Sequence, residues 1–202
     1  MSLEKRVLAV ENLFQQLEQE SAQFEKVSHI HCFSTCGKCC TYPDIEASPL
    51  EFLPWAFHLF LEGEAETTLQ QLNLNHSSTC IIYKQLFATH LGRCDNYQYR
   101  GLICRLFGNA ANRDKNGQLR LVTCSPIKEQ QHKEYLATQT AIAKGLKVPI
   151  FTDYYMLLNQ IDFHLGNIIL PINKALKMAL EEVLQYYAYR PLPHVTHHKH
   201  PA

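Results

Sequence analysis

Cysteine is the residue type whose number and spacing in this sequence point most directly to chemistry. All eight cysteines lie between residues 32 and 124 of a 202-residue chain. They form a dense group of four followed by four scattered positions: Cys32, Cys36, Cys39 and Cys40, then Cys80, Cys94, Cys104 and Cys124. Thiolates are the preferred ligands of structural zinc and of iron–sulfur clusters. We therefore predict that all eight are candidate metal ligands.

The spacing inside the first group suits metal ligation. Cys36 and Cys39 are separated by two residues, so one short turn can direct both thiolates at one centre, and Gly37 permits the tight backbone that this requires. Adjacent residues on a helix point about 100° apart. Cys39 and Cys40 therefore reach a cluster several ångströms wide more easily than they reach a single ion. Metal binding would also tie distant loops together.

Other uses of cysteine remain open alternatives. A single cysteine is often a small core residue, eight cysteines can form four disulfides, and Cys36 with Cys39 could be a redox dithiol. No secretory signal or membrane-length apolar run is found, so we expect a reducing cytoplasm, where disulfides are rare. Zinc and an iron–sulfur cluster are both compatible with the sequence: two zinc sites would use all eight cysteines, and one four-iron cluster would use four.

The composition is that of a globular chain and gives no sign of nucleic-acid binding. The sequence is 46% hydrophobic and 19% charged, with 8 Gly and 9 Pro, which excludes a disordered or low-complexity chain. Nineteen basic residues balance nineteen acidic ones, so no net field attracts nucleic acid or an anionic membrane. Four cations lie near the cysteines as a small local patch: Lys38, Arg93, Arg100 and Arg105. Neither a protein partner nor a catalytic dyad is identifiable.

Two arginines flank Cys104 in the sequence. Guanidinium groups at Arg100 and Arg105 would stabilise the negative charge of a multi-thiolate centre. The alternative is that they form ordinary ion pairs with acidic residues on the surface. His29 and His31 are more typical of exposed or capping residues than of metal ligands.

Hydrophobic periodicity predicts a mainly α fold, or α+β if a few short strands are counted. An apolar heptad pattern predicts a helix over 3–26, packed on the core rather than forming a dimer. Ser48-Pro49-Leu50-Glu51 is a capping-box helix start, and Gly63 marks the end of that helix. Further helices are predicted over 64–74, 126–145, 152–165 and 171–188, and strands over 79–83 and 118–123. Thr152-Asp153 is expected to cap a helix, and Tyr97 and Tyr99 to lie on one side of a short strand.

These elements are expected to form one domain over 1–202, with helices around an irregular cysteine-rich metal-binding centre. We assign 28–124 to the cysteine-cluster region, 125–190 to a helical C-terminal half, and 191–202 to a disordered tail.

Several cysteine-containing segments together resemble a known family. These are Cys36-Gly37-Lys38-Cys39-Cys40, Cys80-Ile81-Ile82-Tyr83, Arg93-Cys94 and the run from Tyr99 to Phe107, which contains Cys104-Arg105. Their order is similar to that of the CxxCxCC, or YkgJ-like, cysteine-cluster proteins, which are described as chelating zinc or iron. The resemblance covers residues 32–124 and implies metal binding by the cysteines.

This sequence departs from the family pattern at two positions. The gap between Cys32 and Cys36 is three residues where two is commoner, which puts the role of Cys32 in doubt. Gly101 stands where proline is usual, which suggests a turn.

The function we favour is a metal- or cluster-binding protein without catalysis of its own. A second hypothesis is an S-adenosylmethionine-dependent iron–sulfur enzyme. The spacing of Cys32, Cys36 and Cys39 matches the ligands of such enzymes, and flagellin lysine N-methylases resemble this group. Against it, Gly37 stands where an aromatic residue is usual, and no barrel-like alternation of strands and helices is present. A thiol redox protein is the third hypothesis; the helical segment before Cys36 does not fit the βαβ unit that it requires.

Overall fold

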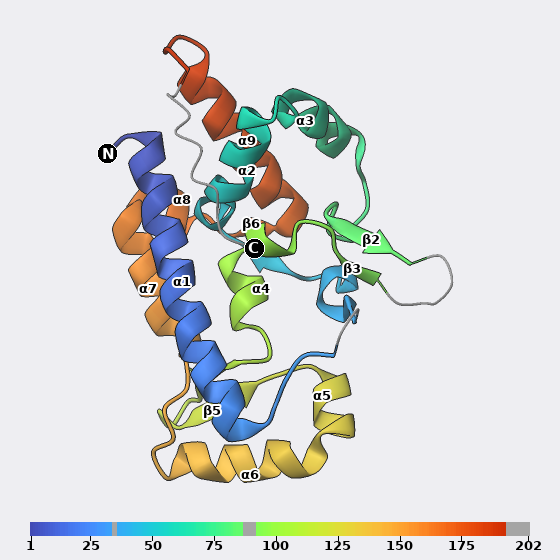
Figure 1. The fold of residues 1–202 in the computed structure, drawn as a ribbon, viewed down its shortest axis with the longest axis vertical. Coiled ribbons are helices and arrows are strands. Elements are labelled where there is room, and N and C mark those ends of the chain that lie inside the picture. The colour runs from blue at the N-terminus through green and yellow to red at the C-terminus, as the bar shows by residue number, and fades with distance from the viewer. Residues whose placement is uncertain (34–35, 87–91, 193–202) are drawn as a thin grey trace.

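The computed structural model describes residues 1–33, 36–86 and 92–192, so most of the predicted tail lies outside the described part. Within that part the chain is mainly helical, with three two-stranded antiparallel sheets, which confirms the predicted fold class (Figure 1). The α-helices are α1 (Leu3–Ser28), α2 (Leu53–Leu61), α3 (Ala65–Leu74), α4 (Leu102–Leu106), α5 (Ser125–Gln130), α6 (His132–Ala143), α7 (Phe151–Ile161), α8 (Phe163–Asn167) and α9 (Ile172–Tyr187).

Short elements connect the helices. Three 3-10 helices are η1 (Lys38–Thr41), η2 (Pro49–Phe52) and η3 (Tyr97–Tyr99). The strand pairs are β1 (Glu46–Ala47) with β6 (Leu170–Pro171), β2 (Tyr83–Gln85) with β3 (Gly92–Cys94), and β4 (Ala110–Arg113) with β5 (Leu119–Val122). No helix in the described ranges has both the length and the apolar character that a membrane crossing requires.

Helix α1 forms as its apolar pattern predicts. Ser2 caps its first turn, and the predicted stripe is buried from Leu3 to Phe24. This face packs against α2, α4, α6 and α7 of the same chain. Figure 1 shows α1 running along much of the length of the molecule. The apolar face of α1 is therefore used within the chain's own core.

Buried apolar side chains form two separate clusters along α1. The larger cluster combines α1 with η2, α2, α7 and α9 and includes Trp55 and Leu176. The smaller one joins the end of α1 to β5, α5 and α6. Its buried members are Phe24, Ile30, Leu121, Ile127 and Ile142. The smaller cluster lies at the end of Figure 1 where α5 and α6 are labelled. Cys80 belongs to the larger cluster, Cys40, Cys94 and Cys104 pack against it, and Cys124 packs against the smaller one.

The predicted start of the second helix is correct. The Ser48 hydroxyl accepts from the Leu50 N–H, and the Glu51 carboxylate accepts from the Ser48 N–H, which together form a capping box. The helix begins as η2 and continues as α2, and Gly63 follows its end with a φ of +76°. The predicted helix over 64–74 is also confirmed as α3.

Two of the predicted C-terminal helices are each broken in two. Gln131 separates α5 from α6; its side chain accepts from the His31 N–H at 3.1 Å and donates to the His31 carbonyl at 2.8 Å. The predicted Thr152-Asp153 cap is wrong, because α7 already begins at Phe151 and the Thr152 hydroxyl donates to Asp153 beside it. Tertiary bonds to a distant backbone, which periodicity does not reveal, override the helix pattern at Gln131.

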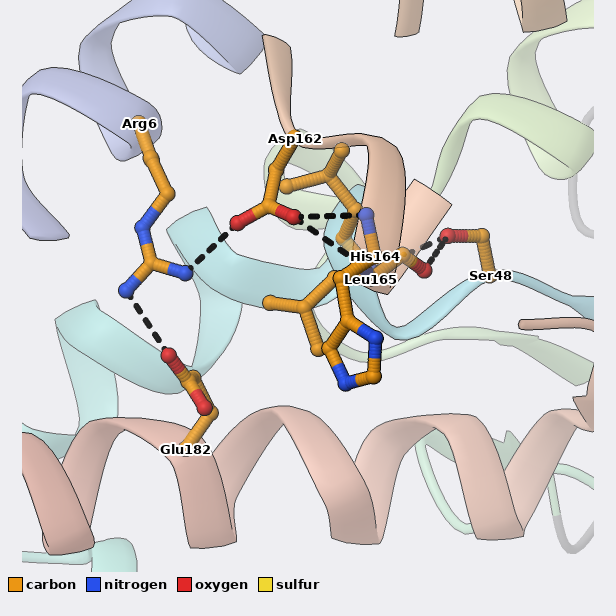
Figure 2. A network of polar contacts seen from close by, with 7 residues as sticks. Arg6, Ser48, Asp162, His164, Leu165 and Glu182 are labelled. Carbon is orange, nitrogen blue, oxygen red and sulfur yellow. Dashed lines mark hydrogen bonds and ion pairs between the residues drawn. The ribbon is translucent and has the colours of Figure 1, made fainter. Parts of the chain in front are cut away.

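Asp162 separates α7 from α8 and joins three parts of the fold (Figure 2). One carboxylate oxygen accepts from the backbone N–H groups of His164 and Leu165, which caps α8. The other forms an ion pair of 2.8 Å with Arg6 on α1, and Arg6 also pairs with Glu182 on α9 at 2.7 Å. This network fastens the C-terminal helices to α1.

Two predictions around the cysteines are wrong. Residues 79–82 form a turn rather than a strand, because the Cys80 N–H donates to the Cys40 carbonyl and the Ile81 N–H donates to the Asn173 side chain. Tyr97 and Tyr99 lie on the 3-10 helix η3 instead of a strand. The strand predicted over 118–123 is correct, as β5, and follows a turn with Gly117 at a φ of +77°.

Candidate metal centre

All eight cysteines line a single cavity of about 460 Å³. They reach it from separate segments of the chain: Cys32, Cys36, Cys39, Cys40, Cys80, Cys94, Cys104 and Cys124. Part of the wall comes from the larger hydrophobic cluster through Phe52 and Ile82, and part from the smaller one through Ile127. In Figure 1 the wall elements are found near the labels β3, α4 and α5. All eight are free thiols in the structure.

The loop that carries Cys36, Cys39 and Cys40 is fixed against the β2–β3 hairpin. Gly37 has a φ of +55°, which a side chain would strain. A Cβ at that position would also lie 2.6 Å from both the Gly92 carbonyl oxygen and the Tyr83 ring. Glycine is needed at position 37 for its φ angle and for the close approach, which confirms the predicted tight backbone. Cys39 and Cys40 follow on η1, a single 3-10 turn.

Cys104 lies on α4, which is attached to η2 by a buried carboxylate. Glu51 is completely buried and accepts from the Ser48 N–H at 2.7 Å, the Ile103 N–H at 2.8 Å and the Tyr155 hydroxyl at 3.3 Å. Burial raises the pKa of Glu51 to about 7 despite these donors. Burial and the nearby Glu51 charge both raise the pKa of Cys104 well above its ordinary value.

Glycine at position 101 is explained by this same carboxylate. Gly101 has an extended conformation with a φ of −64°, so no unusual backbone angle requires glycine. A Cβ there would lie 2.7 Å from a Glu51 carboxylate oxygen and from the Phe52 ring. The departure from the family's proline therefore reflects close packing at the start of α4 and not the turn that the sequence suggested.

Four cations line the cavity together with one acid, Glu25, among the described residues. Arg105 is buried, forms an ion pair with Glu18, donates to the Arg100 carbonyl at 3.0 Å, and lies over the Phe14 ring. Arg105 therefore has an ion pair with an acidic residue, as the alternative held, but its side chain is buried rather than on the surface. The other three cations are Lys38, Arg93 and Arg100.

Arg100 differs from Arg105 because part of its guanidinium has no partner. Its charge lies 3.8 Å from the centre of the exposed Tyr97 ring. Its Nε is buried, and no hydrogen-bond partner for it exists among the described residues. The Arg100 charge also lowers the pKa of Cys39 and opposes the rise at Cys94, so it lies close enough to favour thiolates there.

The thiols divide into an inner and an outer group by their electrostatic neighbours. The pKa of Cys104 is raised, after burial and Glu51, by the charges of Cys80, Cys39 and Cys94. The charges of cysteines from this same set also contribute to the raised pKa values of Cys40 and Cys80. We call Cys39, Cys40, Cys80, Cys94 and Cys104 the inner cysteines. After burial, the pKa of Cys32 is raised by the charges of Cys36, Cys39 and Cys124. Cys39 thus acts on both sets, and we call Cys32, Cys36 and Cys124 the outer cysteines.

Burial keeps most inner thiols protonated in the metal-free chain. It raises the pKa of Cys80 to about 12 and also raises that of Cys94. Cys39 is the exception: a hydrogen bond from the Cys40 thiol lowers its pKa to about 7, and the same bond raises the pKa of Cys40. Metal binding by these sulfurs would therefore release protons.

The sulfurs surround the cavity without meeting at one point. Among the described residues, no three Cys, His, Asp or Glu side chains are close enough together to hold a single ion. No histidine is found in the described lining, and His29 and His31 are exposed at the end of α1. The sequence analysis missed Glu51 as a site residue, although its capping-box position was visible. It also missed Asn173, for which there was no local signal.

Comparison with known proteins gives one match. Residues 31–135, just over half of the chain, match the CxxCxxCC family model, which is described as a "Putative zinc- or iron-chelating domain". The match spans all eight cysteines and excludes α1, α6 beyond its first turn, α7, α8 and α9. Searches of curated proteins and of solved structures find no match. The chain belongs to this family of cysteine-rich metal-chelating domains.

Proposed function

We propose that this protein binds metal through its inner cysteines and that the metal is held as an iron–sulfur cluster. The observation that carries the proposal is the convergence of eight cysteines, spread from residue 32 to residue 124, on one cavity. Unrelated core cysteines would not collect in this way. Four cysteines are enough for one cluster, and the inner group contains five.

The residues around the cavity fit an anionic sulfur-ligated centre. Several thiolates on one centre leave it with net negative charge, which nearby cations and N–H donors stabilise. Among the described residues, Lys38, Arg93 and Arg100 have no ion pair with Glu25, the one acid in the described lining, whose carboxylate accepts from Asn109 at 2.8 Å. The buried Arg100 Nε has no hydrogen-bond partner in that part of the chain, and the Arg100 charge favours the thiolate form of Cys39 and Cys94. A negatively charged centre would give this donor a partner.

The width of the cavity favours a cluster over a single ion. A lone zinc ion needs four ligand atoms at about 2.3 Å around one point. No three candidate ligands in the described part of the chain approach one point in this way. A cluster several ångströms across accepts ligands from separate directions, such as adjacent Cys39 and Cys40 on η1. Zinc is the second candidate, because eight sulfurs suffice for two four-coordinate sites.

The role we propose is binding rather than catalysis. General acid–base chemistry usually needs a histidine or a free carboxylate within reach of the reacting atoms. In the described lining the single carboxylate, Glu25, is already hydrogen-bonded and histidine is absent. In its described lining the cavity thus supplies positive charge and thiols, and we assign those thiols to the metal.

Anaerobic purification with elemental and acid-labile sulfide analysis tests the proposal. We expect a brown protein with about four iron and four sulfide per chain. A colourless protein with one or two zinc ions would reject the cluster in favour of the second candidate. Absence of both metals would overturn metal binding itself.

Serine variants then test the ligand set. Cys39→Ser and Cys104→Ser should each lower the metal content. Cys32→Ser is the matched control, because Cys32 is an exposed outer cysteine. Equal metal content in all three variants would contradict the assignment of the inner cysteines.

A further inference from the structure

Asn173 in the first turn of α9 makes three hydrogen bonds to the loop that carries Cys80. Its side-chain amide donates to the Ser77 carbonyl at 3.0 Å and to the Thr79 carbonyl at 2.8 Å. Its side-chain oxygen accepts from the Ile81 N–H at 2.9 Å. One side chain therefore fixes the backbone on both sides of Cys80.

The loop has few other constraints. Residues 75–82 contain no helix or strand. Apart from Asn173 they are held by short-range turns, by the bond from the Cys80 N–H to the Cys40 carbonyl at 3.0 Å, and by the bond from the Asp95 N–H to the Ile82 carbonyl at 2.9 Å. Cys80 is nevertheless only 6% exposed, whereas the other seven cysteines are partly or fully exposed. Asn173 on one side and the η1 loop on the other hold it in place.

The same turn of α9 also contributes to the cavity wall. Ile172 lines the cavity, and its N–H donates to the carbonyl of Ile45, another lining residue, at 2.9 Å. This segment lies outside the 31–135 family match. The start of α9 therefore lines the cavity through Ile172 and hydrogen-bonds, through Asn173, to the loop that carries Cys80.

We propose that Asn173 is a positioning residue of the metal centre, which holds the Cys80 sulfur at the cavity and makes the C-terminal helix part of that centre. This inference rests on the proposed function for its metal, but its geometric part concerns the chain alone. Without the amide, the two carbonyls and the Ile81 N–H lose their partners, and the loop can open locally.

Two variants and one control test the inference. Asn173→Ala removes all three bonds. Asn173→Asp keeps the size of the side chain and the acceptor for Ile81, and removes only the two donated bonds. Asn159→Ala is the control: Asn159 lies on α7, donates to Asn167 at 3.3 Å and is not in the cavity lining.

The first measurement is the alkylation rate of each cysteine in the metal-free, reduced protein, mapped by mass spectrometry. Cys80 should react about 30-fold faster than in the unaltered chain in Asn173→Asp, which loses two hydrogen bonds, and about 150-fold faster in Asn173→Ala, which loses three. The alkylation rates of Cys104 and Cys124 should change less than about threefold, because the lost bonds lie in the loop of Cys80. General destabilisation would instead raise all of the rates together. A Cys80 rate that is unchanged, or that rises no more than the others, overturns the inference.

The second measurement is retention of iron or zinc against a chelator after anaerobic loading. Both Asn173 variants should lose metal faster than the unaltered chain and Asn159→Ala. Retention equal to that of the control would also overturn the inference. If the unaltered chain itself holds neither metal, the proposed function fails; if it holds metal while the Asn173 variants behave as the control, only the role of Asn173 fails.

Discussion

Replacing Glu51 by glutamine should change the pH dependence of stability in a defined direction. Glu51 is fully buried beside Cys104 with no cation partner among the described residues, and it accepts hydrogen bonds from Ser48, Ile103 and Tyr155. Burial disfavours its charged form, whereas the three donors favour it. Burial wins, because the pKa of Glu51 rises from 4.5 to about 7.

The size of the effect follows from this shift. Between pH 4.5 and about 7 the native chain keeps a proton on Glu51 that the unfolded chain has lost. The stabilising contribution of Glu51 is therefore complete below pH 4.5 and is lost as the pH rises through about 7. A shift of this size corresponds to about 3 kcal/mol.

Urea denaturation of metal-free, reduced protein from about pH 4 to about pH 8 measures this difference. The free energy of unfolding of the unaltered chain, relative to Glu51→Gln, should fall by about 3 kcal/mol across the range. The comparison cancels the other titrating groups, because glutamine does not ionise. A difference that stays constant, or that rises with pH, would show that the three donors outweigh burial and would refute the reasoning.

Three further substitutions test other parts of the structure. Arg6→Met leaves two partly buried carboxylates without their cation and should lower the free energy of unfolding by about 2 kcal/mol, as measured by urea denaturation. The control Lys177→Met loses an exposed helical ion pair and should lower it by about 0.5 kcal/mol or less. Gly101→Ala should cost about 1–3 kcal/mol in the same assay, since its Cβ would lie 2.7 Å from the Phe52 ring, and full stability would contradict the packing. Arg100→Gln should raise the pKa of Cys39 and slow its alkylation at neutral pH about two- to threefold, and an unchanged rate would separate Arg100 from the thiols.

Much of the helical framework was predictable because its signals are local. The apolar stripe of α1, the capping box before α2 and the glycine after α2 each lie within a few residues of the element that they define. Helix breaks were not predictable. Gln131 and Asp162 end helices through bonds to His31 and Arg6, which are more than 90 residues away in the sequence. Periodicity carries no information about such partners.

The candidate site was predictable in its composition and not in its supports. The eight cysteines that the spacing singled out all line one cavity, their role as metal ligands stays a prediction, and the tight turn at Gly37 is confirmed. The strand predicted over 79–83 failed because the backbone there bonds to Asn173 and Cys40 instead of to a neighbouring strand. Which cysteines share a metal remains a prediction.

The small hydrophobic cluster beneath α5 and α6 gives the molecule a weak point next to its sulfurs. In the described part of the chain it has five buried apolar members, and six partly buried residues, Phe33 and Cys124 among them, pack against it. Few buried contacts make local opening easier than global unfolding. Amide protons of α5 and α6 should therefore exchange sooner than those of α2 and α9. Such opening would leave the larger cluster folded and expose Cys124, which packs against the small cluster and lines the cavity.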